Sequence, residues 1–193
     1  MFWRKKKSFT EETKPVVENA LHRVNEKVDG FGNFLSPEPN SNIRSAIDKN
    51  LLFKLEFCFI FADIIVRAFG GGSTAKFARR RLLMSSFVDS MVTAGGIRHN
   101  DKKIVEETAF EISHYRAPIF MEHAKNILSM NNTVDKADSL PPKSAAGYFQ
   151  LQLFVSRCAE TITNEYVIDS EAQNVSGHMF EAAFQYAEAL WKE

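Results

Sequence analysis

The stretch LLFKLEFCFIFADIIVRAF, residues 51–69, decides the fold because it is the longest apolar run in the chain. Its length approaches that of a membrane-spanning helix. It also carries Lys54, Glu56, Asp63 and Arg67, and charges inside an apolar run favour a core helix of a soluble protein over a membrane span. Because a helix that is apolar on nearly every side needs neighbours on every side, we expect a long central helix at about residues 41–68.

Helical periodicity recurs on both sides of this helix, and no stretch shows the alternation of a β-strand. Thr13 is expected to cap the first helix and Gly30 to end it, whereas Gly95 and Gly96 should end the third. The segment from Asn100 onward predicts either two helices or one helix sharply kinked at Pro118. The further helices are expected at residues 14–28, 74–94, 144–167 and 170–191. The sequence therefore predicts an all-α, single-domain bundle of six to seven helices.

Composition narrows the class of protein further. The 193 residues fit one domain, with residues 1–9 as a disordered basic tail and residues 29–41 and 131–142 as loops. The 24 basic side chains balance 24 acidic ones, so no overall field attracts nucleic acid. Cys58 and Cys158 lie in apolar stretches, which indicates buried free thiols and a cytoplasmic location. Nothing indicates a cofactor.

An unusual loop separates the first two predicted helices. Phe31, Phe34 and Leu35 stand among glycines and prolines, so apolar side chains are held in a segment that cannot be helical. If they are exposed, they form an interaction loop for a partner protein. If they are not, they close the core.

One helix carries a Glu-x-x-His spacing, which serves dinuclear metal sites in helical bundles. Glu111 and His114 form this pair, with Glu107 one turn earlier, and His178 with Glu181 is the one possible second pair, in reversed order. Helical projection places these side chains opposite the apolar stripes, where water should solvate them. We therefore favour a solvated surface and keep a metal-carboxylate enzyme as an alternative function.

Three charges recur at helical spacing inside the apolar run. Glu56, Asp63 and Arg67 lie seven and four residues apart, which puts them on one stripe of the helix. They could form a buried ionic cluster, the kind of feature found at functional sites. We favour a stripe that touches water, because charged side chains are seldom fully buried.

The glycines at 70–72 lead into a cluster of hydroxyl and basic side chains. Ser73, Thr74, Lys76, Arg79, Arg80 and Arg81 follow them. A glycine-rich approach to a helix start with nearby cations is typical of phosphate sites, so a phosphate or nucleic-acid binder is a second alternative. The order of a Walker loop is absent, and consecutive arginines on a helix point in different directions. We favour a flexible helix connection with solvated arginines over a phosphate site.

The leading hypothesis for function is a non-enzymatic protein that acts through protein contacts, as an adaptor, inhibitor or regulator. It rests on the absence of a local catalytic signature and on 17 phenylalanines, which suit either a thick core or an apolar surface. The sequence does not decide whether the chain forms homo-oligomers. The basic start of the chain, Phe2, Trp3, Arg4, Lys5, Lys6 and Lys7, offers at most weak contact with a membrane surface.

Overall fold

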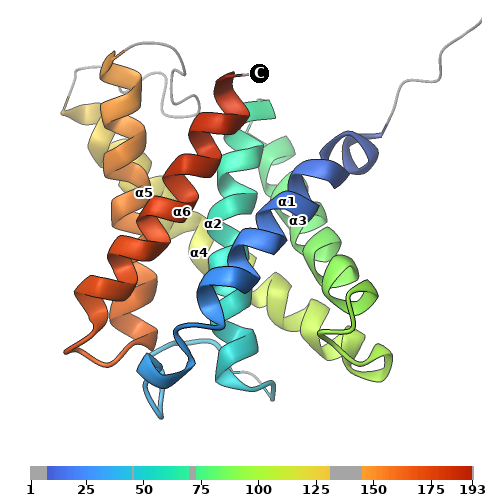
Figure 1. The fold of residues 1–193 in the computed structure, drawn as a ribbon. Helices are drawn as coiled ribbons and strands as arrows, with labels where there is room; N and C mark the ends of the chain where they lie inside the picture. Colours follow the sequence, from blue (N-terminus) through green and yellow to red (C-terminus); the bar gives the residue numbers. More distant parts are fainter. Residues whose placement is uncertain (1–7, 45, 70–72, 131–144, 193) are drawn as a thin grey trace, which may run out of the picture.

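The computed structural model describes residues 8–44, 46–69, 73–130 and 145–192, apart from the side chains of residues 69, 73–76, 145–146 and 191–192. This part of the chain forms an all-helical bundle with no strand, as the sequence predicts (Figure 1). The helices are α1 (Phe9–Val28), α2 (Lys49–Phe69), α3 (Ser73–Thr93), α4 (Lys102–Ser129), α5 (Ala145–Tyr166) and α6 (Ala172–Lys192), with short 3₁₀ helices at Gly32–Phe34 and His99–Asp101. Across the described ranges, no helix has the length and hydropathy needed to cross a membrane.

Helix α2 contacts each of the other five helices, and every residue from 55 to 67 is buried (Figure 1). It begins at Lys49 rather than at Ser41, because Asp48 caps it. The Asp48 carboxylate accepts a hydrogen bond from the Leu51 amide at 3.0 Å, whereas the Ser41 hydroxyl accepts one from the Ile43 amide and forms a local turn. The predicted start of this helix was therefore wrong.

Phenylalanine fills the core. The rings of Phe53, Phe57, Phe59, Phe61, Phe87, Phe120 and Phe154 are all fully buried. Measured between ring centroids, Phe59 lies 5.3 Å from Phe120 in a tilted pair, and Phe61 lies 4.8 Å from Tyr186 in an edge-on pair. Such pairs add to the stabilisation that burial provides. Both thiols are buried and free, and burial raises the pKa of Cys58 and of Cys158.

The structure changes the predicted start of α1 and decides between the two alternatives for α4. Helix α1 begins at Phe9, so residues 8 and 9 belong to the bundle rather than to a tail, and Thr13 lies inside the helix with its hydroxyl donating to the Phe9 carbonyl. Helix α4 runs through Pro118 as one helix. Because proline has no N–H, the carbonyl of His114 lacks the donor that residue 118 would otherwise supply in the helix. Gly95, at φ +76°, ends α3 as predicted.

A capping box fixes the start of α1. Ser8 accepts a hydrogen bond from the Glu11 amide at 3.3 Å, and the Glu11 carboxylate accepts one from the Ser8 amide at 2.8 Å. We expect Ser8→Ala to lower the free energy of unfolding by about 1 kcal/mol, because it removes the oxygen that accepts from the Glu11 amide, although the Ser8 amide can still donate to Glu11. Urea unfolding followed by circular dichroism measures this. Thr93→Ala is the control, because its exposed hydroxyl donates to the Asp89 carbonyl and takes no part in the box. An equal loss in both variants would contradict the role of the box.

Candidate functional site

Glu56, Asp63 and Arg67 of α2 lie in two buried ionic clusters. In the first, which we name the Arg116 cluster, Arg116 of α4 donates to both Glu56 oxygens at 2.7 and 2.9 Å. It also donates to both oxygens of Glu165 on α5 at 2.8 and 2.7 Å, and Tyr166 donates to Glu56 at 2.9 Å. The side chains of Arg116 and Glu56 are both 0% exposed. Three helices are therefore joined by one guanidinium group.

Burial raises the pKa of two groups in the Arg116 cluster. It raises the pKa of Glu56 above its usual value, and the hydrogen bonds and charge of Arg116 offset only part of that effect. It also raises the pKa of Tyr166. Glu56 accepts hydrogen bonds from Arg116 and from Tyr166. Donors paired with acceptors in this way are typical of a structural hydrogen-bond network.

The second cluster, which we name the Asp63 cluster, pairs Asp63 with two arginines. Arg67 donates to one Asp63 oxygen at 2.5 Å and Arg80 of α3 donates to the other. The Arg67 guanidinium also lies over the Phe154 ring, 4.4 Å from its centroid. Burial alone would raise the pKa of Asp63, but the two guanidinium groups together lower it below its usual value. The expectation of a water-exposed stripe was wrong, because Asp63 is 0% exposed.

The predicted interaction loop packs inward. Phe31 and Leu35 are buried, and Phe34 is half-buried against the core. The Phe31 ring lies 6.0 Å from the ring of His178, and the carbonyl of Phe34 accepts a hydrogen bond from Ile168. These side chains close the core over the α5–α6 turn, so they do not form an exposed docking loop.

The predicted metal ligands do not converge. Glu107, Glu111 and His114 are exposed on α4, and His178 and Glu181 are exposed on α6. Glu181 accepts a hydrogen bond from Gln185, and His178 packs on the loop. In the described part of the chain, no group of three or more His, Cys, Asp or Glu side chains is arranged to hold a metal ion.

The arginines of the predicted anion site do not come together either. Ser73, Thr74 and Lys76 begin α3, but their side chains and residues 70–72 lie outside the described part of the chain. Arg80 is buried in the Asp63 cluster. Arg79 lies over the ring of Phe9 and Arg81 over the ring of Phe110, so the three guanidinium groups point to three different surroundings. Phe2, Trp3 and the basic residues 4–7 also lie outside the part of the chain that the structure describes.

An open groove between α3, α4 and the segment before α2 gathers residues from two of these predicted sites. We name it the α3–α4 groove; its volume is about 690 Å³. It is lined by Asn42, Ile43, Arg44, Phe77, Arg81, Glu107, Phe110, Glu111, Ser113, His114 and Tyr115. The Arg81 guanidinium lies 4.3 Å from the centroid of the Phe110 ring, and the Phe77 ring meets that of His114 edge-on at 6.5 Å. Asn42 donates to the Tyr115 hydroxyl at 3.3 Å.

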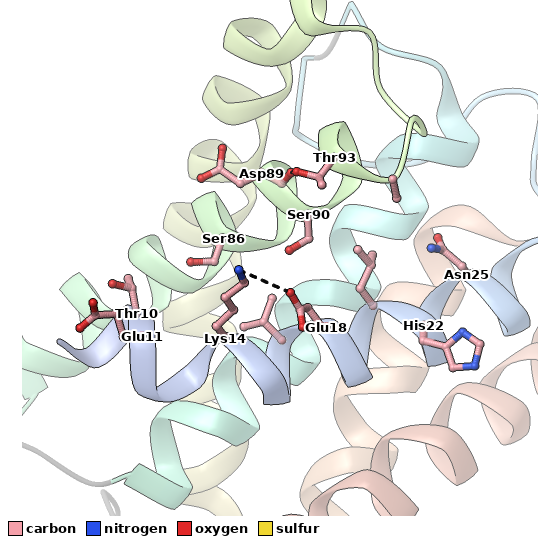
Figure 2. Close-up of a pocket in the computed structure, with 13 residues that line it drawn as sticks. Thr10, Glu11, Lys14, Glu18, His22, Asn25, Ser86, Asp89, Ser90 and Thr93 are labelled. Atoms are coloured by element: carbon pink, nitrogen blue, oxygen red, sulfur yellow. Dashed lines mark hydrogen bonds and ion pairs between the residues drawn. The ribbon is translucent and has the colours of Figure 1, made fainter. Parts of the chain in front are cut away.

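A second groove, of about 660 Å³, lies between α1 and α3 (Figure 2). Figure 2 shows Lys14, Glu18 and His22 of α1 opposite Ser86, Asp89 and Ser90 of α3. Val17 and Leu21, which are buried, also line it. We name it the α1–α3 groove. Its walls are hydroxyl and charged side chains, several of them already paired, such as Asp89 with Lys102 at 2.5 Å.

Comparison with protein-family models, with curated proteins and with solved structures finds no match to this chain.

Arg116 and Arg80 were not predicted from the sequence to be members of the buried clusters. A signal was present. Arg116 lies four residues after Ile112 and four before Phe120, and Arg80 lies four before Met84, so helical projection places both on core-facing stripes. Phe77, Phe110 and Tyr115 were missed in the groove because they lie on two different helices, and one sequence does not show how those helices pair.

Proposed function

We propose that this protein acts without catalysis, by binding another protein through the α3–α4 groove. The observation that supports this is the exposure of Phe77, whose surface is 43% accessible beside the stacked Arg81–Phe110 pair. Aromatic and arginine side chains carry most of the binding energy in protein interfaces. In this groove they meet at one place, within reach of a partner.

Its composition also separates the groove from the two alternatives. A phosphate site would combine cations without nearby carboxylates, yet Glu107 and Glu111 line the same groove as Arg44 and Arg81. A metal site would need carboxylates and imidazoles that converge, whereas His114 packs edge-on against Phe77. An exposed aromatic ring with a polar, charged rim is typical of a protein interface.

The test is a selection of random peptides displayed on phage against the folded chain. We expect recovered peptides to bind Phe77→Ser at least about tenfold more weakly, because truncation of a central aromatic contact commonly costs 2 kcal/mol or more. Fluorescence polarisation of the synthetic peptides measures their affinity. Leu82→Ser is the matched control, since Leu82 lies on the same helix, is 47% exposed and does not line the groove.

Leu82→Ser should change the affinity by less than about twofold. Equal losses in both variants, equal affinity for all three proteins, or a selection that yields no peptide would each contradict the proposal. Circular dichroism of each variant verifies that the helices are intact.

A further inference from the structure

Ser113 differs from the other buried hydroxyls of the bundle. It is 2% exposed and lines the α3–α4 groove, yet its Oγ has no hydrogen-bond partner. The buried hydroxyl of Thr108, on the same helix, donates to the Ile104 carbonyl at 2.9 Å, and that of Thr163 donates to the Ala159 carbonyl at 2.7 Å. An unpaired buried hydroxyl destabilises the folded chain, so its presence in a groove points to a bond that a ligand completes.

The walls around Ser113 are aromatic. Phe77, Phe110, His114 and Tyr115 all line the groove. The Arg81 guanidinium covers one ring face, and the Tyr115 hydroxyl is held by Asn42. Planar rings with fixed neighbours favour a planar apolar group, which packs against them offset or edge-on.

The charge of the lining is balanced. Arg44 and Arg81 contribute two positive charges, and Glu107 and Glu111 contribute two negative ones. A phosphate group would meet the glutamates, and an ammonium group would meet the arginines, so neither gains from the lining as a whole. The groove therefore favours an occupant without charge.

We propose that the α3–α4 groove recognises a Phe, Tyr or Trp side chain of a partner protein, and that Ser113 donates a hydrogen bond to a main-chain carbonyl beside that side chain. The inference rests on the proposed function and specifies the occupant. A groove of about 690 Å³ is large enough for a ring together with its adjoining backbone.

The test uses N-acetyl-phenylalanine amide as the probe, with N-acetyl-alanine amide and inorganic phosphate as comparisons. Titrations followed by ¹⁵N amide chemical shifts give the affinity and the location of each compound. We expect the aromatic probe to shift the amides of residues 77–81 and 110–115 and to bind more tightly than the alanine compound.

Two variants separate recognition from folding. Ser113→Ala should weaken the aromatic probe by about fivefold, the value of one hydrogen bond, while raising Tm by about 2–4 °C because the unpaired hydroxyl is gone. Thr108→Val removes a hydroxyl that is paired and does not line the groove, so it should lower Tm and leave the affinity for the probe unchanged. Because the two variants should change Tm in opposite directions and only Ser113→Ala should weaken binding, together they separate a loss of recognition from a loss of stability.

The proposal is overturned if Ser113→Ala binds the probe as tightly as the natural chain, if the alanine compound binds equally well, or if phosphate competes for the groove. A failure of the proposed function would give a different result from a failure of this inference. In that case the displayed peptides would be insensitive to Phe77→Ser. Peptides that depend on Phe77 but not on Ser113 would leave the groove as an interface and reject the hydrogen bond.

Discussion

Replacing Arg116 with methionine is expected to lower the free energy of unfolding by about 3–5 kcal/mol, because it leaves the buried Glu56 carboxylate without its cation. Glu56 has no exposed side-chain surface, and Arg116 supplies two of its three hydrogen bonds. Methionine keeps much of the volume, so the loss reports on charge and hydrogen bonding more than on a cavity. Urea unfolding at pH 7 followed by circular dichroism measures it.

Arg157→Met is the control for the Arg116 cluster. Arg157 pairs with Glu160 at 3.2 Å on α5, and its side chain is 65% exposed, so the loss should stay below about 1 kcal/mol. Adding Glu56→Gln to Arg116→Met removes the unpaired charge and should recover part of the loss. A loss in Arg116→Met no larger than in Arg157→Met would contradict a buried, joined cluster.

Replacing Asp63 with asparagine is expected to lower the free energy of unfolding by about 3–5 kcal/mol at pH 7, since two buried arginines lose their counter-ion. The effect depends on pH in a definite direction. The folded-state pKa of Asp63 lies below its usual value of 3.8, so the carboxylate stabilises the fold above that pH. This stabilisation disappears as the pH falls through the lower folded-state pKa.

The difference between the natural chain and Asp63→Asn should therefore be constant near neutrality and shrink below about pH 3.8. Unfolding curves from pH 7 to pH 2 measure it. Asp89→Asn is the control, because Asp89 is 56% exposed where it pairs with Lys102. A difference that stays the same down to pH 2 would contradict the assigned pairing.

The helices could be predicted from sequence because each one buries a periodic apolar stripe, and because Gly95 ends α3 through its positive φ. Starts were harder to predict. Ser8 and Asp48 cap α1 and α2, but Thr13 and Ser41 are equally good capping residues by type. Which one serves depends on where the chain must turn to pack.

The buried clusters show a second limit. The spacing of Glu56, Asp63 and Arg67 was visible on one helix, but their burial depends on Arg116 and Arg80, which come from other helices. A charge can be buried only where its partner meets it, and single-sequence patterns describe one helix at a time. This is why the rule that charges face water failed for these residues.

The α3–α4 groove shows the same limit of a single sequence, which does not reveal which helices pack together. Arg81 was assigned to an anion site, and Glu107, Glu111 and His114 were assigned to a metal site. The structure places all four around one groove with Phe77 and Phe110, because α3 packs beside α4. The residue types were informative, but their shared location was not readable from the sequence.

The most direct measurement is the location of a phage-selected peptide on the ¹⁵N-labelled chain, by amide chemical shifts at saturating peptide. Binding in the α3–α4 groove predicts shifts concentrated at residues 77–81 and 107–115, the segments that line it. Shifts concentrated instead at residues 10–25 and 86–94 would place the peptide in the α1–α3 groove and contradict the proposed interface (Figure 2).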